Sequence, residues 1–377
     1  MEINQKIKVV TIISELRMGG AEVLVKEYAL LIDESKIDYI VIVDGTRIGS
    51  PIEKQLDEAN KKVIYLYRNP FFRYSLIKRI IRKTTHRILL YTTLKKIKPD
   101  IIHVNLGSYG FWGCNRTADK YARKNRLRIF DTVHNEPIVH LDSPKRGYLL
   151  KHKNVRFIAL HEEMKREIEE IFSVRNTTVI RNGIDIQRFM SLSKSKEEMR
   201  RALGIPEDSF VIGNIGRMVM QKNHHFLIEI FQELLEMKPN AYLLLVGEGD
   251  LEDEIRNHLC KLNLEKKATI ISNRHDIPEI LNAMDVFVFP SQFEGLGIVL
   301  IEAQAVGVKC VVSDRIPKEA FVTNKIWELS LDAPLIDWCN AILDSSSANN
   351  LCLDNRLEDY DIRKIVKDLE ALYLENS

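Results

Sequence analysis

The sequence predicts an α/β protein with two doubly wound parallel sheets, and three observations support this class. The chain has 377 residues, which is enough for two domains with separate cores. Short, almost wholly apolar runs alternate with helical patterns, which is typical of parallel sheets covered by helices on both faces. This alternation starts twice, near Ile7 and again near Ser209. We therefore expect two domains that face each other across a cleft.

The individual elements follow in the order that this class requires. Strand-like runs in the first half read IKVVTII, DYIVIV, KVIYLY, DIIHVNL, RIFDTVH and VRFIAL. Those in the second half read SFVIGNIG, AYLLLVG, ATIIS, DVFVFP and KCVVS. Between the strands, the spacing of apolar residues predicts helices over 21–32, 223–237 and 251–264.

Domain boundaries are predicted from the breaks in this pattern. The segment 181–209 is polar and contains glycine and proline, so we interpret it as the linker. The domains are then residues 1–190 and 191–357. Residues 342–356 are predicted to be a loop, and an amphipathic helix is predicted within 358–377.

Composition excludes several classes of protein. Apolar residues make up 45% and charged residues 29% of the chain, which argues against disorder, and the net charge of +2 indicates no particular partner. The five cysteines form no CxxC pair and no cluster with zinc spacing, so we expect reduced thiols and a cytoplasmic protein. The N-terminal residues do not resemble a signal peptide, and no apolar run approaches the roughly 18 residues of a membrane span.

In doubly wound sheets, ligands bind beyond the carboxyl ends of the strands, so we examined the residues that follow each strand. Arg217 and Lys222 follow the run VIGNIG and precede a predicted helix. Two cations at such a place favour a diphosphate, although two solvated loop cations are the simpler interpretation. Gly247 and Gly249 follow LLLVG and would let the backbone approach a ligand, but glycine is common at such turns.

The segment FPSQFEGLGIVLIEAQAVG, residues 289–307, carries two acids around a glycine-rich turn. Gly295 and Gly297 mark the expected start of a helix, whose free N–H groups suit a phosphate. Glu294 precedes this turn, and Glu302 is expected two turns into the helix, about 12 Å further along. Carboxylates so far apart can hold the two ends of a nucleotide-sugar. The alternative is a helix-capping Glu294 and an unrelated surface Glu302.

Together these segments resemble glycosyltransferase family 4, the retaining, nucleotide-sugar-dependent enzymes with the GT-B arrangement of two Rossmann-like domains. The chain is most similar to members that build bacterial capsular polysaccharides and exopolysaccharides. The similarity runs in family order from about residue 7 to about residue 320. The matching segments are RMGGAEVLV (17–25), VHNEP (133–137), RNGID (181–185), IGRMVMQKN (215–223), LVGEGD (245–250), DIPEILNAMDVFVFPSQFEGLGIVLIEAQAVG (276–307) and VVSDRIPKE (311–319).

The resemblance implies four catalytic residues. Arg217 and Lys222 would neutralise the donor diphosphate, Glu294 would bind hydroxyls of the transferred sugar, and His134 would sit beside that sugar. Taken without the family, His134 would be interpreted as a capping or core-edge histidine. The resemblance also implies that the C-terminal helix packs back on the first domain.

The resemblance further implies a substrate-binding set. A first-domain glycine loop would face the donor phosphates and the acceptor, Glu302 would hold the ribose, and a segment after ATIIS would lie near the base. His161 stands where many relatives carry a small polar residue, and the segment after ATIIS lacks a frequent glycine. The expected residues are Gly19, Gly20, Glu302, Gly295, Leu296, Gly297, Ile298, Asn273, Arg274 and Gly247.

The implied reaction moves a hexosyl or N-acetylhexosaminyl group, with UDP as the expected nucleotide. The leaving nucleoside diphosphate would be stabilised electrostatically, and the transition state would resemble an oxocarbenium ion. A front-face path, in which the departing phosphate takes the acceptor's proton, needs no protein nucleophile. No DxD-type motif is evident, so we expect no metal and no other cofactor.

Residues 68–98 contain ten Lys and Arg residues and no acid. Ile77, Ile80, Ile81, Thr84 and Ile88 follow helical spacing and are expected to pack on the first sheet. The cations beside nearby aromatic residues suit an anionic membrane surface, which fits an acceptor on a polyprenyl diphosphate at the inner leaflet. A solvated helix face is the alternative, and no nucleic-acid motif accompanies the patch.

Two other classes of function stay open at this point. One is a sugar-nucleotide epimerase or a phosphorylase of the same architecture, although no lysine signature for pyridoxal phosphate is visible. The other is a non-catalytic subunit that binds a nucleotide-sugar without turnover.

Overall fold

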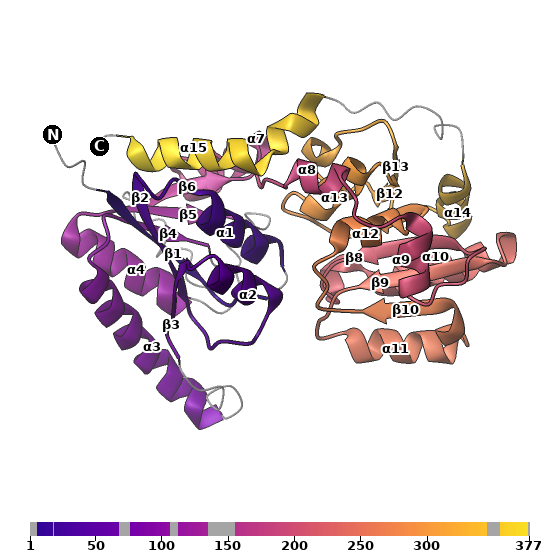
Figure 1. The fold of residues 1–377 in the computed structure, drawn as a ribbon, viewed down its shortest axis with the longest axis horizontal. Helices are drawn as coiled ribbons and strands as arrows, with labels where there is room; N and C mark the ends of the chain where they lie inside the picture. The colour runs from indigo at the N-terminus through magenta and orange to yellow at the C-terminus, as the bar shows by residue number, and fades with distance from the viewer. Residues whose placement is uncertain are drawn as a thin grey trace. The chain divides into compact units, whose positions relative to one another are not determined.

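The computed structural model describes residues 6–17, 19–67, 76–105, 112–134, 155–344 and 355–375. The chain divides into two compact units, drawn in Figure 1. Unit 1 comprises residues 1–182 together with 362–377, and unit 2 comprises residues 183–361. The change of unit therefore falls at Asn182, eight residues before the sequence-based boundary at 190.

Unit 1 is built on a parallel sheet of seven strands in the order β3-β2-β1-β4-β5-β6-β7. The sheet reverses its direction of growth between β1 and β4, which is the topological switch point of doubly wound sheets. Six strands lie where the apolar runs predict them, and the two-residue β7 was not predicted from the sequence. The strands are β1 (Ile7–Ile13), β2 (Ile37–Val43), β3 (Lys62–Tyr65), β4 (Ile101–Val104), β5 (Arg128–Thr132), β6 (Val155–Ala159) and β7 (Thr178–Val179).

Helices flank this sheet, and the last of them is supplied by the end of the chain (Figure 1). Leu369 and Tyr373 of this C-terminal helix are fully buried in a core that also contains residues of α1 and β1. Arg128 donates to the carbonyls of Tyr373 and Glu375, at 2.6 and 2.8 Å, and so fixes the end of the helix. The helices are α1 (Gly20–Leu31), α2 (Pro51–Glu58), α3 (Leu76–Ile97), α4 (Trp112–Asn125), α7 (Glu162–Phe172) and α15 (Ile362–Leu374).

Helix α3 corrects one expectation about the basic stretch. Ile88 was expected to pack on the sheet, but 61% of its surface is exposed. In the described half of the helix, the buried side is formed by His86, Leu90 and Leu94, which repeat every four residues. His86 Nδ1 lies 3.3 Å from Oδ1 of the buried Asp44, and this polar contact turns Ile88 toward solvent. The side chains of residues 76–84 lie outside the described part of the chain.

Unit 2 repeats the same winding with six parallel strands in the order β10-β9-β8-β11-β12-β13. Its core is almost wholly apolar and surrounds α10, of which Leu227, Ile230 and Phe231 are fully buried. The sequence predicted five of these strands and missed β13. The strands are β8 (Phe210–Ile215), β9 (Ala241–Val246), β10 (Ala268–Ile271), β11 (Val286–Phe289), β12 (Lys309–Ser313) and β13 (Ile326–Leu329).

The first two helices of unit 2, α8 and α9, lie in the segment interpreted from the sequence as a linker. The helices are α8 (Ile186–Met190), α9 (Lys196–Ala202), α10 (His224–Met237), α11 (Glu252–Lys261), α12 (Ile277–Asn282), α13 (Ile298–Val306) and α14 (Leu335–Leu343). The described residues of the unit also form the short 3-10 helices η2 (Met220–Lys222), η3 (Glu265–Lys267), η4 (Lys318–Ala320) and η5 (Asn355–Tyr360). None of the helices in the described part of the chain combines the length and apolar character needed to cross a bilayer.

The polar segment interpreted as a linker is ordered as part of unit 2. Ser195 and Glu198 form a capping box that starts α9. Lys196 and Arg200 then reach Asp285, at 2.6 and 2.7 Å, and tie α9 to the segment before β11. Of the predicted loop 342–356, the first two residues end α14 and the last two belong to η5, whereas residues 345–354 lie outside the described part of the chain.

Candidate functional site

The loop after β8 carries the two cations that the sequence singles out. Arg217 follows the strand after one intervening residue, Gly216, and its side chain is exposed. Lys222 ends η2, and Asn223 separates it from α10 by adopting a left-handed backbone conformation with φ of 55°. Only 13% of the Lys222 side chain is exposed. The structure therefore distinguishes a solvated cation from one that is enclosed.

Lys222 and Glu294 form a buried ion pair. The ammonium Nζ of Lys222 lies 2.7 Å from Oε1 of Glu294, whose side chain is only 8% exposed. The same ammonium lies 4.7 Å from the centre of the Phe289 ring, which adds a cation–π contact. Burying two charges is costly, so a pair of this kind persists where geometry and further contacts compensate for desolvation. The sequence named both residues but did not predict that they touch.

Backbone contacts hold the two loops that carry this pair. The carbonyl of Gln221 accepts a hydrogen bond of 2.8 Å from the backbone N–H of Gln292. The Gln221 side chain donates to the Phe293 carbonyl at 2.9 Å. These bonds join η2 to the segment between β11 and α13. Lys222 and Glu294 are therefore positioned by their neighbours, each from a different strand end of the same sheet.

Gly247 and Gly249 serve internal packing between two loops. A Cβ at Gly247, which has φ of +149°, would lie 2.0 Å from the carbonyl oxygen of Gly216. A Cβ at Gly249 would lie 2.3 Å from the carbonyl oxygen of Met218. Hydrogen bonds join the same loops, because the N–H of Gly216 donates to Val246 and that of Met218 to Glu248. The close approach that these glycines permit is to the chain's own backbone.

The turn before α13 differs from the expectation in one respect. The helix begins at Ile298 and not near Gly295, so Glu302 lies little more than one turn into it and is partly buried. Gly297 takes the N-cap position with φ of 77° and supplies no side-chain cap. Leu296 is buried beside it, with 2% exposure. The first N–H groups of α13 thus follow a turn that only glycine adopts easily.

Gln304 anchors α13 and was not singled out from the sequence. It is fully buried, and its Nε2 donates to the carbonyl of Ala320 at 2.7 Å. Its Oε1 accepts the N–H of Val322 at 2.7 Å. The helix that carries Glu302 is in this way fixed to the segment around η4. An amide between two alanines on an apolar helix is the sequence signal that could have pointed to it.

The segment after β10 holds its arginine in an internal pair. Asn273 is exposed and has φ of 55°. Arg274 donates to both carboxylate oxygens of Asp276, at 2.8 and 2.5 Å. Partial burial alone would raise the pKa of Asp276, but the hydrogen bond and charge of Arg274 hold the pKa below its ordinary value. The guanidinium is therefore already occupied at the N-cap of α12.

In unit 1, Gly19 and Gly20 form the start of α1. Gly19 is the N-cap and supplies no side-chain cap, and Gly20 is the exposed first residue of the helix. The carbonyl of Gly19 accepts the N–H of Val23 at 2.9 Å. A Cβ at Gly19 would meet the carboxylate of Glu22 at 2.3 Å. The acid in the first turn thus lies against this glycine.

His134 follows β5 and belongs to a polar chain at the carboxyl ends of the strands of unit 1. Its Nε2 lies 3.1 Å from Oδ1 of Asn105, which follows β4. Asn105 in turn donates to the hydroxyl of Thr11 on β1, at 3.0 Å. Three neighbouring strands thereby share one hydrogen-bonded chain. The histidine is oriented by Asn105.

A second polar chain lies deeper in the same sheet. Nδ1 of His103 lies 2.5 Å from the hydroxyl of Tyr373, and Nε2 lies 2.7 Å from that of Thr132. Burial, together with the charge on His134, lowers the pKa of His103 to about 3. The imidazole is therefore neutral at physiological pH and ties α15 to β4. No spacing in the sequence indicates this contact, because its partners are 270 residues apart.

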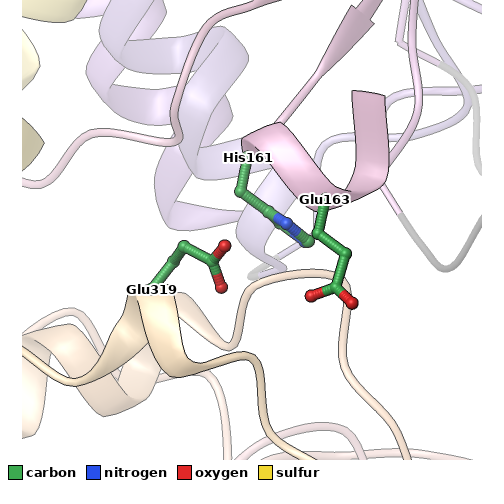
Figure 2. A group of neighbouring side chains, drawn as sticks. All are labelled: His161, Glu163 and Glu319. Atoms are coloured by element: carbon green, nitrogen blue, oxygen red, sulfur yellow. The ribbon is translucent and has the colours of Figure 1, made fainter. Parts of the chain in front are cut away.

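His161 has a structural role in this chain. It is the N-cap of α7, and its Nδ1 accepts the N–H of Met164 at 3.2 Å. A small polar residue caps a helix in the same way, which explains why a histidine is tolerated here. Figure 2 shows His161 and Glu163 at the start of α7 and Glu319 on η4. The first two belong to unit 1 and the third to unit 2, so we infer no metal site from them.

Two family models match the chain in sequence. Residues 18–188 match Glycosyltransferase Family 4, and residues 195–326 match Glycosyl transferases group 1. Among curated proteins, the chain is 28% identical to UDP-Gal:alpha-D-GlcNAc-diphosphoundecaprenol alpha-1,3-galactosyltransferase of Escherichia coli, over 99% of this chain and 98% of that protein. It is 32% identical to the putative glycosyltransferase EpsF of Bacillus subtilis, over 51% of this chain and 48% of that protein.

The fold is shared with solved structures. The crystal structure of Anabaena Alr3699/HepE in complex with UDP and glucose matches with a TM-score of 0.77 and 18% identity, over 97% of this chain and 99% of that one. Sequence models over both halves and the GT-B fold therefore agree, and the chain belongs to glycosyltransferase family 4.

Proposed function

We propose that this chain transfers a hexosyl or N-acetylhexosaminyl group from a UDP-sugar to a saccharide on a polyprenyl diphosphate carrier, with retention of configuration. The product would enter a capsular polysaccharide, an exopolysaccharide or a related glycan. The observation that carries the proposal is the buried pair of Lys222 and Glu294, with 2.7 Å between ammonium and carboxylate.

The pair places two complementary functions side by side. A diphosphate needs cations, and a sugar needs acceptors for its hydroxyl hydrogens. When a donor binds, its phosphate oxygens compete with Glu294 for the ammonium of Lys222. The carboxylate oxygen that Lys222 gives up can then accept from a sugar hydroxyl. Arg217, which is exposed, adds a second cation for the diphosphate.

The nature of donor and acceptor rests on relatives. The Escherichia coli protein is named for UDP-Gal as donor and a GlcNAc-diphosphoundecaprenol acceptor, and its similarity covers almost the whole of both chains. The Anabaena structure contains UDP and glucose. These names support a UDP-sugar and a lipid-linked saccharide for this chain.

The proposed reaction depends on stabilising the charge of the leaving group and needs no covalent bond between the sugar and the protein. The bond between the anomeric carbon and the phosphate oxygen breaks, and a bond to the acceptor oxygen forms on the same face. The acceptor proton passes to the departing phosphate oxygen, which Lys222 and Arg217 stabilise as its charge develops. Glu294 orients the sugar and forms no bond to it. Because these cations meet the charge of the leaving group, we propose that transfer requires no metal ion.

A ligand-induced melting screen tests the donor site. UDP-, GDP-, ADP- and dTDP-sugars are added to the wild type and to Arg217→Ala and Lys222→Ala, with Arg256→Ala as control. Arg256 pairs with Glu252 on the surface of α11. UDP-hexoses or UDP-N-acetylhexosamines should raise the melting temperature of the wild type and the control only. A shift that survives both site substitutions contradicts the diphosphate assignment.

A transfer assay separates the rival functions. The protein is incubated with the stabilising UDP-sugar, with and without a synthetic N-acetylglucosaminyl polyprenyl diphosphate, in buffer containing EDTA. A longer lipid-linked saccharide is expected only with the acceptor. Interconversion of the donor without an acceptor indicates an epimerase, and binding without turnover indicates a non-catalytic subunit. Activity that EDTA abolishes and Mn²⁺ restores contradicts metal independence.

A membrane surface is the proposed place of this reaction. The described part of α3 exposes Arg87, Lys95 and Lys96 as well as Ile88, so basic side chains and an apolar side chain are exposed on the same helix. An apolar side chain among basic residues suits an anionic leaflet. Flotation with anionic and neutral liposomes is the test, with Arg87→Glu/Lys95→Glu as variant and Lys54→Glu on α2 as control. Equal recovery with both kinds of liposome contradicts the proposal.

A further inference from the structure

Two histidines face each other on unit 2, outside the Lys222–Glu294 pair. His225 is the second residue of α10, and His258 lies in α11. Their Nδ1 atoms are 3.0 Å apart, and their rings are tilted by 32°. At this distance one Nδ1 carries a hydrogen and the other accepts it, because two lone pairs would repel. The two Nδ1 atoms therefore face each other across one position, which the shared hydrogen occupies.

An acid completes the group. Oε1 of Glu254 lies 3.1 Å from Nε2 of His225. Glu254 and His258 are four residues apart on α11 and so share one face of that helix. The negative charge favours the proton of His225 on Nε2, which leaves its Nδ1 lone pair free toward His258. Nε2 makes no hydrogen bond in this structure, and a small turn of the Glu254 side chain would give the outer-shell arrangement that orients histidine ligands in metal sites.

The space around the pair is open to an ion. A cavity of about 420 Å³ is lined by His225, Glu254, Asn257, His258 and Lys261. His225 retains 31% exposure and Glu254 62%, so an ion can enter from solvent and keep water as further ligands. Lys261 is exposed, and its ammonium can turn away from an incoming cation.

We propose that His225 and His258 bind a divalent first-row transition-metal ion through their Nδ1 atoms, with Glu254 as the outer-shell partner of His225. Two imidazole nitrogens on a tetrahedral Zn²⁺ lie about 3.3 Å apart, so the pair needs to open only slightly. Imidazole suits Zn²⁺, Ni²⁺ and Cu²⁺. When the ion binds, the hydrogen between the two Nδ1 atoms passes to solvent and His258 takes up a proton from solvent on Nε2. Each ring is then neutral and offers the lone pair of its Nδ1 to the ion.

The bound ion joins α11 to the first turn of α10. Because α10 begins two residues after Lys222, the ion fastens the helix that follows the loop of the candidate site. Its effect is on the stability of unit 2, and it takes no part in the transfer reaction. This proposal therefore does not depend on the proposed transferase function. It also does not conflict with the proposal that sugar transfer requires no metal ion.

The test uses the full chain after dialysis against EDTA. Zn²⁺ is titrated calorimetrically, and Co²⁺ is titrated while its visible absorption is followed, for the wild type, His225→Gln, His258→Gln and Glu254→Gln. The controls are His275→Gln, His161→Gln and Cys260→Ser, which remove other potential ligands. Circular dichroism and melting in EDTA confirm that each variant is folded.

We expect one Zn²⁺ per wild-type chain and a higher melting temperature with the ion. Loss of either histidine should weaken binding at least about tenfold, and Glu254→Gln should weaken it about 10- to 100-fold. The controls should bind like the wild type. The proposal is overturned if the wild type does not bind Zn²⁺ at micromolar concentration, or if both histidine variants bind with wild-type affinity. It is also overturned if a control variant loses binding while the histidine variants keep it.

Discussion

The carboxyl ends of the two sheets hold their polar groups differently, although the sheets share one strand order. In unit 2 this edge carries Arg217, Lys222 and Glu294, with a largely buried ion pair of 2.7 Å among them. In unit 1, His134 and Asn105 at the corresponding edge form a hydrogen-bonded chain with Thr11. The strand orders are the same up to the sixth strand.

This difference indicates which parts of such a fold determine its function. The strand order and the covering helices fix which residues reach the edge, and the loops decide their chemistry. A cation in an enclosed ion pair suits a diphosphate, and a chain of hydrogen-bonding side chains suits a sugar hydroxyl. Under the proposed function, unit 2 therefore handles the donor charge, and His134 and Asn105 of unit 1 contribute hydrogen-bonding groups.

The largest effect is expected from Glu294→Gln, which breaks the charged pair of unit 2 while keeping its shape. Transferase activity should fall about a hundredfold to a thousandfold, because the amide is a weaker acceptor for the sugar hydroxyl and no longer pairs with Lys222. Steady-state kinetics with a UDP-sugar measures this. Glu252→Gln, on an exposed pair of α11, is the matched control and should leave activity unchanged. Equal activities of the two variants would contradict the role of Glu294.

The next largest effect is expected on the stability of unit 2, through the packing of loops at the carboxyl edge of its sheet. Gly247→Ala should lower the free energy of unfolding by about 1–3 kcal/mol or more, because the new Cβ would meet the Gly216 carbonyl oxygen at 2.0 Å. Gly204→Ala is the control, since Gly204 also has a positive φ but nothing lies within 4 Å of its Cβ position. Its cost should be about 1 kcal/mol. Urea unfolding compares the two, and equal losses would show that the loop moves aside.

A smaller effect is expected in unit 1 from Tyr373→Phe. This change leaves Nδ1 of the buried His103 without its partner, and the free energy of unfolding should fall by about 1–2 kcal/mol. Tyr242→Phe, which removes a partly buried contact with Thr269, should cost about 0.5 kcal/mol. Denaturant unfolding measures both variants. A Tyr373→Phe protein as stable as the control would show that α15 is held by apolar packing alone.

A further effect depends on pH and concerns Asp131 on β5, on the face opposite to His103. It is 4% exposed, and burial raises its pKa from 3.8 to about 7. The folded state therefore favours the protonated acid, and this contribution to stability is lost as pH rises from about 4 through 7. Asp131→Asn avoids the loss, so its melting temperature should exceed that of the wild type by a few degrees at pH 8 and match it below pH 4. Asp38→Asn, on a surface pair, should show no such trend. A difference that does not change with pH would argue against burial of a titrating acid.

Most of the fold could be predicted from the sequence because it depends on local patterns. The helix expected over 223–237 occurs at His224–Met237, and the strand within DVFVFP occurs at Val286–Phe289. The missed strands, β7 and β13, are short or only partly buried, so their periodicity is weak. The segment 181–209 was misread because its polar residues form helix caps and ion pairs of unit 2.

The candidate site could be predicted only as separate residues. Arg217, Lys222 and Glu294 were named from their places after strands. The contact between Lys222 and Glu294 joins residues 72 positions apart, and no pattern in the sequence measures that distance. The same holds for His225 and His258, which are 33 positions apart and lack the close spacing of a zinc motif.

By itself, the sequence determined two doubly wound sheets and the positions at which polar residues leave them. It could do so because apolar periodicity and chain order act over a few residues at a time. Only the tertiary structure decided which of those residues meet. It enclosed Lys222 with Glu294, turned Ile88 outward, and used Gly247 to admit a carbonyl of the chain itself. These outcomes depend on the register of strands and the packing of loops far apart in the chain, where a shift of one residue reverses the face that a side chain occupies.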